Sequence, residues 1–287
     1  MGFLSTLTGS FSSPAVDNPT VAMVEAAYRH HGLDARYLNC EVSADDLADA
    51  VRGARAMGWA GFNCSLPHKV AVIEHLDSLA ASAEVIGAVN CVVRRPDPQS
   101  GADLLVGENT DGQGFLASLR EVVDPAGLAV VILGAGGAAR AVAVEVALAG
   151  ARSVTVVNRS PGRGQDVVDL LTDRTPTASD LVIWDSTYAI PADVDVLVNA
   201  TSIGLAPHGD VCPDVDLATV LPGLVVADVI PNPPRTALLV AAEAAGATIL
   251  DGVGMLVNQA VLGIRLWTGL DADPAVLRAA LAEASIA

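Results

Sequence analysis

Residues 128–140 read LAVVILGAGGAAR, and this stretch determines the fold expected for the second half of the chain. The apolar run LAVVIL is typical of a strand that is buried on both faces of a parallel sheet. GAGGAAR then supplies a tight turn and opens a helix, and SVTVVNRS (153–160) reads as the next strand. The order strand, turn, helix, strand predicts a parallel α/β unit with right-handed crossovers.

The spacing of the small residues in this turn indicates a ligand. Gly134 permits the turn, Gly136 lets the main chain approach a pyrophosphate, and Ala139 takes the close-packing third position. The free N–H groups at the start of the following helix then bind the phosphates. An ordinary tight turn is the alternative reading, but the complete strand–turn–helix context favours dinucleotide binding.

The end of the second strand of this unit indicates which dinucleotide is bound. An acidic residue at that point binds the ribose 2′-hydroxyl of NAD. This chain instead has NRSPGR (158–163), in which Arg159 and Arg163 follow Asn158. A guanidinium pairs with a phosphate through its planar fork, so the sequence favours NADP(H), with Arg159 as the stronger candidate. The alternative is that both arginines cover a solvated helix start.

The N-terminal part of the chain also alternates strands and helices. Strands are expected over 3–9, 35–42 and 61–66, and helices over 19–32, 43–58 and about 70–83. Ser43 and Asp46 have capping-box spacing, and RRPDPQSGAD (94–103) is rich in turn formers and reads as a hairpin or surface loop. The alternation predicts a second α/β unit with a mostly parallel sheet.

One residue in this first unit stands out. Lys69, at the end of NCSLPHK (63–69), is the only lysine of the chain, and the other fifteen basic residues are arginines. It lies just past the carboxyl end of an expected strand, where open α/β sheets bind ligands. Asp111 in GENTDGQGF and Asn90 in GAVNCVV are further candidates.

These three residue types suit the interconversion of an alcohol and a ketone beside a nicotinamide. An ammonium group exchanges the alcohol proton, and a carboxylate orients it and hydrogen-bonds the substrate. Each residue also has a structural explanation: Lys69 as a solvated tip, Asp111 as a helix cap and Asn90 as a turn residue.

Composition excludes several other functions. The formal net charge of −17 disfavours binding to nucleic acid and to anionic membrane surfaces. There is no signal-like N-terminus and no uninterrupted apolar stretch long enough to span a bilayer, so a cytoplasmic protein is expected. The five histidines lack ligand spacing, so no metal is expected. Four cysteines lie far apart and are expected to be reduced: Cys40, Cys64, Cys91 and Cys212.

Eight stretches together resemble one family. NCSLPHK resembles the Asn-Val-Thr-x-Pro-x-Lys signature of shikimate dehydrogenases, and GAVNCVV and ENTDGQG resemble the next two signatures in the same order. GAGGAAR and NRSPGR match that family's NADP loop and arginine clamp. NATSIGL (199–205), GVGMLVNQA (252–260) and WTG (267–269) resemble its later motifs. The resemblance extends over about residues 7–270.

The resemblance implies two α/β domains that flank a cleft. A substrate-binding and catalytic domain would span 1–107, completed by a C-terminal helix at 257–287, and a Rossmann-like NADP-binding domain would span 108–256. The implied reaction is the reversible reduction of 3-dehydroshikimate by NADPH, a step of aromatic amino acid biosynthesis. The partner would be a small cyclic polyol, and a homodimer is compatible with the sequence.

The resemblance also assigns roles to individual residues. Lys69 and Asp111 would form the catalytic pair. The implied substrate-binding residues are Ser13, Ser65, Asn90, Asp111 and Gln259. The implied cofactor-binding residues are Gly134, Ala135, Gly136, Gly137, Ala138, Asn158, Arg159, Arg163, Thr201, Val229, Gly252 and Met255.

The chain departs from the family pattern near its N-terminus. The family places a Ser-x-Ser pair before a proline, where both hydroxyls hold the substrate carboxylate. In GSFSSP, Ser13 fits the second position but Phe11 occupies the first. Ser10 and Ser12 are candidate replacements, although neither has the same alternation phase on an extended chain.

A second departure is Pro231, which stands where the family often has a tyrosine near the same carboxylate. The ring-hydroxyl half of the pocket is therefore kept and the carboxylate half altered. Three hypotheses follow: a dehydrogenase of shikimate or a very close analogue, a dehydrogenase of quinate, an amino-shikimate or another cyclitol, and a non-catalytic dinucleotide sensor. The loss of a matched polar contact changes substrate specificity by orders of magnitude.

Overall fold

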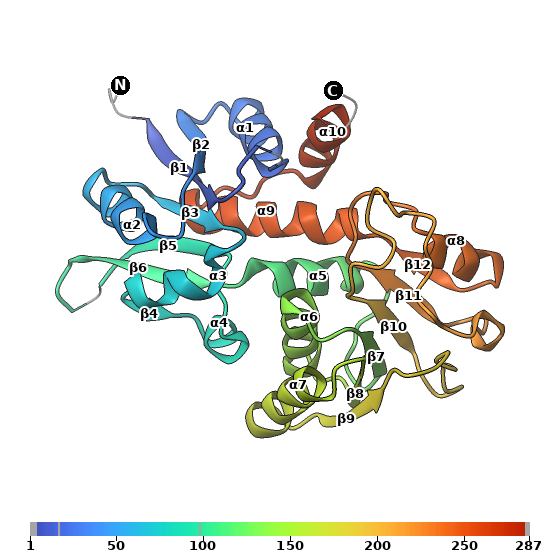
Figure 1. Cartoon of the computed structure of the whole chain (residues 1–287). Helices are drawn as coiled ribbons and strands as arrows, with labels where there is room; N and C mark the ends of the chain where they lie inside the picture. The colour runs from blue at the N-terminus through green and yellow to red at the C-terminus, as the bar shows by residue number, and fades with distance from the viewer. Residues whose placement is uncertain (1–4, 17, 98, 285–287) are drawn as a thin grey trace. The chain divides into compact units, whose positions relative to one another are not determined.

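The computed structural model describes residues 5–16, 18–97 and 99–284, and these form two compact units (Figure 1). The first unit runs as far as Thr110 and includes the chain from Gln259 onward, and the second is Asp111–Asn258. The assignment of 1–107 with 257–287 to substrate binding and of 108–256 to NADP binding stays a prediction. Each unit carries its own six-stranded sheet.

The first unit contains a mixed sheet with the strand order β2-β1-β3-β5-β6-β4. Its strands are β1 (Thr6–Ser12), β2 (Ala35–Glu41), β3 (Gly61–Cys64), β4 (Ser78–Leu79), β5 (Cys91–Pro96) and β6 (Asp103–Glu108). Strands β2, β1 and β3 are parallel, whereas β5 is antiparallel to both β3 and β6. The β5–β6 pair confirms the hairpin expected around 94–103.

The helices of this unit are α1 (Thr20–His30), α2 (Leu47–Ala56), α3 (His68–Ala71), α4 (Ala81–Ile86) and α10 (Pro274–Ala284), with a 3₁₀ turn at Val72–His75. Helix α1 packs beside α10 (Figure 1). The core between α2 and the sheet includes Phe11, Leu47, Val51 and Phe62, all buried. Apolar residues at these spacings on the strands and on α2 account for that burial.

The single helix expected over about 70–83 is wrong. Leu76 has an extended main chain (φ −105°, ψ 156°), and strand β4 follows it and pairs with β6. The Asp77 carboxylate accepts a hydrogen bond from Leu105 N–H at 2.6 Å and one from Arg55 at 2.8 Å. These tertiary contacts outweigh a weak local preference for helix. The strand expected over 3–9 covers Thr6–Ser12, and residues 3 and 4 lie outside the described residues.

The second unit contains an all-parallel sheet with the order β12-β11-β10-β7-β8-β9. Its strands are β7 (Ala129–Leu133), β8 (Ser153–Asn158), β9 (Ala178–Ile183), β10 (Val196–Asn199), β11 (Val225–Asp228) and β12 (Thr248–Leu250). Its helices are α5 (Thr110–Arg120), α6 (Gly137–Leu148), α7 (Pro161–Arg174) and α8 (Ala237–Ala244), with a 3₁₀ turn at Leu217–Thr219. Helix α9 (Gly252–Thr268) begins here and ends in the first unit.

In the second sheet the chain adds strands outward from β7 to β9 on one side and from β10 to β12 on the other, so the order of connection changes side between β7 and β10. Chain segments running through β8 and β9 build one side of the sheet, and segments running through β11 and β12 build the other. Open α/β sheets bind ligands at the carboxyl ends of the strands at such a switch point. This arrangement confirms the Rossmann-like prediction and places the Gly134 turn, which follows β7, at the switch point.

All four cysteines are free thiols, and Cys64 and Cys91 are buried. Across the described ranges, no helix is both long enough and apolar enough to cross a bilayer.

Candidate active site

The carboxyl ends of β1, β2 and β3 gather candidate residues at one edge of the first sheet. Ser13 follows β1, Glu41 ends β2 and Ser65 follows β3. Main-chain hydrogen bonds fix these loops together: Ser65 N–H donates to Phe11 C=O and Ser13 N–H donates to Leu66 C=O, both at 3.0 Å. Ser13 and Ser65 are exposed, so the structure brings two predicted substrate-binding hydroxyls to the same edge.

Lys69 lies on α3, a four-residue helix fastened at this edge from two sides. The buried ring of His68 hydrogen-bonds Val42 C=O at 2.8 Å, and Val89 N–H donates to the Lys69 carbonyl at 2.7 Å. Burial raises the pKa of the Cys64 thiol to about 12, and the nearby Lys69 charge acts in the opposite direction. Lys69, a half-buried residue, is therefore held on α3 just past the end of β3, as the sequence predicts.

Asn90 has a structural task at the start of α5. Its side chain is 3% exposed, its Oδ1 accepts a hydrogen bond from Thr110 N–H at 2.7 Å, and its Nδ2 donates to Thr110 Oγ1 at 3.0 Å. The amide thus fixes the residue that precedes Asp111 in the chain. Its predicted contact with substrate stays a prediction.

Asp111 lies in the first turn of α5, which belongs to the second unit. The next residue, Gly112, allows close packing: a Cβ there would lie 2.6 Å from Ala141 C=O of α6. Only glycine fits this approach, which sets Asp111 beside the helix that the glycine-rich turn opens. Because Lys69 belongs to the other unit, the pairing of the two side chains stays a prediction.

The glycine-rich turn has the geometry that its sequence requires. Gly134 has φ +104°, a conformation that favours glycine, and its N–H donates to Val157 C=O at 2.8 Å. A Cβ at Gly134 would lie 3.0 Å from both Ala200 C=O and Thr201 Cγ2. Gly136 is exposed, and a Cβ there would meet no atom within 4 Å, so the main chain is open to a ligand.

A cavity of about 290 Å³ adjoins this turn. It is lined by Ala135, Gly136, Gly137, Arg140, Arg163, Asp166 and Val167. The Nε of Arg140 is buried and has no hydrogen-bond partner among the described residues. The sequence prediction missed Arg140, although its position four residues after Gly136 places it one helical turn above the phosphate loop.

The two arginines after β8 differ in position. Arg163 lines the cavity, whereas Arg159 is exposed at the end of β8 and does not line it. Neither guanidinium forms a hydrogen bond or an ion pair with the described residues. Asn158 Nδ2 donates to Ser160 C=O at 2.8 Å, which shapes the loop that carries Arg159. Both arginines are thus available to an anionic ligand.

A buried carboxylate organises the ends of β10 and β11. Asp228 Oδ2 accepts hydrogen bonds from Asn199 Nδ2 at 3.0 Å and from Thr236 Oγ1 at 2.9 Å. Burial raises the pKa of Asp228, against the hydrogen bonds that it accepts. Asn199 Oδ1 in turn accepts from the Thr201 hydroxyl at 2.7 Å, so this network fixes one predicted cofactor residue.

The remaining predicted residues lie along α9 and the end of β11. A Cβ on Gly252 would lie 2.4 Å from the Ile230 carbonyl and 2.6 Å from that of Val229, so Gly252 and Val229 are close neighbours. Met255 is half-buried one turn along α9, and Gln259 is 5% exposed after the helix enters the first unit.

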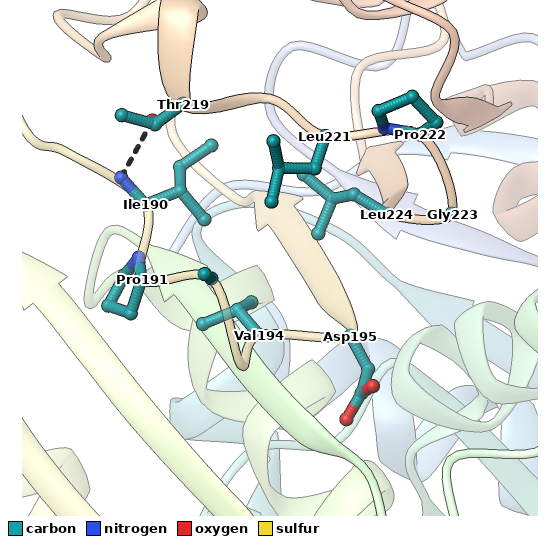
Figure 2. Close-up of a pocket in the computed structure, with 10 residues that line it drawn as sticks. Ile190, Pro191, Val194, Asp195, Thr219, Leu221, Pro222, Gly223 and Leu224 are labelled. Carbon is teal, nitrogen blue, oxygen red and sulfur yellow. Dashed lines mark hydrogen bonds between the residues drawn. The ribbon is translucent and has the colours of Figure 1, made fainter.

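A second cavity, of about 270 Å³, lies at the opposite edge of the second sheet (Figure 2). Asp195 and Leu224, which line it, immediately precede β10 and β11, and Ile190 N–H is fixed by Thr219 Oγ1 at 2.9 Å. Figure 2 shows mainly apolar side chains around a single carboxylate. Such a lining does not suit a pyrophosphate, so the cavity at Gly136 is the better cofactor site.

Nowhere in the described chain do three or more His, Cys, Asp or Glu side chains form a group that could hold a metal ion.

Three family models match the chain. A model described as the shikimate dehydrogenase substrate binding domain matches residues 13–92. A shikimate/quinate 5-dehydrogenase model matches residues 118–205, and a shikimate 5′-dehydrogenase C-terminal domain model matches residues 252–282.

Whole-chain comparisons extend these matches. The NADP(+) shikimate dehydrogenase of Methanopyrus kandleri is 41% identical over 96% of this chain and 95% of its own length. The crystal structure of a Thermus thermophilus shikimate 5-dehydrogenase with NADP(H) and shikimate has a TM-score of 0.81 at 31% identity, covering 97% and 99% of the two chains. The ligand-free 5-ketofructose reductase of a Gluconobacter species has a TM-score of 0.93 at 56% identity, covering 99% and 100%.

Proposed function

The chain belongs to the shikimate dehydrogenase family, and from this we propose that it is an NADP(H)-dependent oxidoreductase that reversibly reduces 3-dehydroshikimate, or a close analogue, to the corresponding alcohol. The observation that carries the proposal is the pairing of two sites within one chain. One unit holds a phosphate-binding turn, and the other holds Lys69 among hydroxyl side chains at the carboxyl edge of its sheet.

The second unit fits a bound NADP(H). Open space above Gly136, the buried and unpartnered Nε of Arg140 and the cavity beside them suit a pyrophosphate. Residues Gly134–Ala138 would hold the phosphates, and Arg159 with Arg163 would hold the 2′-phosphate. Thr201, Val229, Gly252 and Met255 would lie along the rest of the cofactor.

When bound, NADPH supplies the hydride that reduces the carbonyl carbon. Lys69, as the ammonium ion, donates a proton to the carbonyl oxygen, and in the reverse direction the neutral amine takes that proton back. In the proposed pairing, Asp111 would hold the ammonium and accept a hydrogen bond from the substrate. Ser13, Ser65, Asn90 and Gln259 bind the remaining substrate oxygens.

A substrate panel tests this function. Purified protein is mixed with NADP⁺ or NAD⁺ and each of shikimate, quinate and fructose, and with NADPH and each matching ketone, while nicotinamide absorbance is followed. We expect turnover with NADP(H) on at least one alcohol–ketone pair. A protein that binds NADPH yet turns over none of these compounds would contradict the proposal.

Reduction of 5-ketofructose is a second candidate function. It is favoured by the 56% identity over essentially the whole chain with the 5-ketofructose reductase. That substrate is an uncharged polyhydroxy ketone, so the same hydride and proton transfers apply to it. The ratio of kcat/KM for 5-ketofructose to that for 3-dehydroshikimate, measured with NADPH, separates the two candidates.

We place the reaction in the cytoplasm, where free thiols such as the four of this chain stay reduced. A homodimer remains part of the proposal, and sedimentation velocity of the purified protein tests it. A single species at monomer mass across micromolar concentrations would exclude the dimer.

A further inference from the structure

The carboxyl edge of the first sheet carries an anionic side chain whose two oxygens both accept hydrogen bonds. Glu41 ends β2 and lies opposite Ser12 in the register of β1 and β2. Its Oε1 accepts a hydrogen bond from the Ser13 hydroxyl at 2.7 Å, and its Oε2 accepts one from Ala15 N–H at 2.5 Å. The hydrogen bond from Ser13, followed by that from Ala15, lowers the pKa of Glu41, so this exposed group is ionised at neutral pH.

The donors that Glu41 uses are those that an anionic substrate would need. A hydroxyl and a main-chain N–H side by side form a seat for a carboxylate, which accepts one hydrogen bond on each oxygen. Ser13 is the residue expected to contact the substrate, yet its hydroxyl already donates to Glu41. A substrate carboxylate at this point would compete with the Glu41 carboxylate for the same two donors. It would also be repelled by the negative charge of Glu41.

Phe11, which lies on β1 two residues before Ser13, offers no replacement donor. Phe11 is 3% exposed, and its ring lies 4.5 Å from that of Phe62 and 5.7 Å from that of Trp59, measured between ring centroids. The side chain is therefore part of the core and brings no polar group to the edge.

The adjacent serines are also withdrawn from solvent. Ser10 is fully buried, donates to Asn39 Oδ1 at 2.7 Å and accepts from Asn18 Nδ2 at 2.9 Å. Ser12 is 2% exposed and its hydroxyl oxygen is enclosed. Neither serine presents a hydroxyl to a ligand, so the replacement that the sequence left open does not occur in this structure.

We propose that Glu41 is a specificity-determining residue that favours uncharged polyhydroxy ketones and alcohols over substrates with a carboxylate, and so favours 5-ketofructose over 3-dehydroshikimate among the candidate substrates of this site. The inference rests on the proposed function, because it concerns the substrate of the same site. Each carboxylate oxygen keeps a further lone pair, so Glu41 accepts a hydrogen bond from a neutral hydroxyl group. The same charge opposes a second carboxylate at close range.

Shikimate and its methyl ester form a matched pair that differs in one charge. With wild-type protein and NADP⁺, we expect kcat/KM for the ester to exceed that for the acid by about tenfold or more, mainly through KM. Glu41→Gln, which keeps the shape and removes the charge, should reduce this preference by about tenfold. Glu41→Asp, which keeps the charge, should retain the preference for the ester.

Asp34→Asn is the matched control. Asp34 is an exposed carboxylate that accepts a hydrogen bond from the Ser5 hydroxyl at 2.8 Å, as Glu41 does from Ser13. Asp34 immediately precedes β2, whereas Glu41 ends it, so the two carboxylates lie at opposite ends of this strand. This variant should leave the ester-to-acid ratio unchanged, which separates a local effect of Glu41 from the net charge of the protein.

Ionic strength tests the same idea without a mutation, should Glu41→Gln fail to fold. The Debye length falls from about 8 Å at 0.15 M salt to about 3 Å at 1 M, so raising the salt concentration to 1 M should weaken the repulsion by the exposed Glu41 and lower KM for shikimate relative to KM for the ester in the wild type. A wild type that prefers the acid, or a ratio that neither Glu41→Gln nor salt changes, would overturn the inference while leaving the proposed function intact. Inactivity on every alcohol and ketone would overturn the proposed function itself.

Discussion

At the scale of single residues, the position of Lys69 follows from contacts that do not involve its own charge. His68 holds α3 to the end of β2, and the Lys69 carbonyl is held by Val89. The main chain is thus fixed on both sides of Lys69. A group that transfers a proton needs such a fixed position. The side chain itself remains half-buried at the sheet edge.

Lys69→Ala should lower kcat on the best substrate by about 10²–10⁴-fold, because a positioned acid–base group is lost. Lys69→Arg is the matched variant: it keeps the positive charge but cannot release a proton near neutral pH, so it should be similarly slow. NADPH affinity, measured by fluorescence titration, should be unchanged in both. Near-wild-type turnover by either variant would show that Lys69 does not transfer the proton.

Arg159→Ala should weaken NADPH much more than NADH. A charge-assisted contact with the 2′-phosphate is worth about 1.5–3 kcal/mol, and NADH lacks that group. Arg152→Ala is the control, because Arg152 immediately precedes β8 whereas Arg159 follows it, at opposite edges of the sheet. Dissociation constants for both cofactors decide the matter, and equal losses for NADPH and NADH would show that Arg159 does not bind the 2′-phosphate.

At the scale of elements, the turn between β7 and α6 contains two glycines with different physical requirements. Gly134 adopts a positive φ and abuts Ala200 and Thr201, so the fold itself requires glycine there. Gly136 has an extended main chain with open space where a Cβ would be. Only the approach of a ligand would require glycine at Gly136, so the two positions separate folding from binding.

Gly136→Ala should leave the melting temperature of the unliganded protein unchanged while weakening NADPH binding by about tenfold or more, since the added methyl group stands in the path of the pyrophosphate. Gly134→Ala should instead destabilise the unliganded protein by about 1–3 kcal/mol, because alanine is strained at this φ. Differential scanning fluorimetry and NADPH titration of both variants check the pair. Unimpaired NADPH binding by Gly136→Ala would argue against this cofactor site.

At the scale of the whole molecule, the proposed cofactor-binding and substrate-binding residues belong to different units. The phosphate-binding turn and the Asp228 network belong to the second unit, and Lys69, Ser13 and Glu41 belong to the first. A ligand that binds only folded protein stabilises the part that holds it. Each ligand should therefore leave its own protection pattern.

NADPH alone should slow amide hydrogen exchange at 134–140 and 158–163 in the second unit. Adding the alcohol substrate with NADP⁺ should extend protection to 13–15, 41–42 and 65–69 in the first unit, because these loops hold the proposed substrate site. Hydrogen-exchange mass spectrometry of the free, binary and ternary states gives both patterns. Protection by NADPH confined to the first unit would reverse the proposed assignment of ligands.

The sequence by itself determined the α/β order of both units, the glycine-rich turn and the place of Lys69 past the end of β3. These features depend on local periodicity and on spacing within one or two elements, which a linear sequence displays directly. The helix expected over 70–83 failed because the Asp77 contacts with Arg55 and Leu105 are long-range, and nothing in the local pattern encodes them.

Only the tertiary structure revealed the unpartnered Nε of Arg140 in its cavity and the position of Glu41 on Ser13 and Ala15. The residues of the Ser13–Glu41 pair are 28 positions apart, and they meet because β1 and β2 pair in a register that sets Ser12 opposite Glu41. Strand register depends on the packing of both faces of the sheet. The sequence therefore proposed Ser13 as a substrate-binding hydroxyl, and the fold determined which carboxylate that hydroxyl contacts.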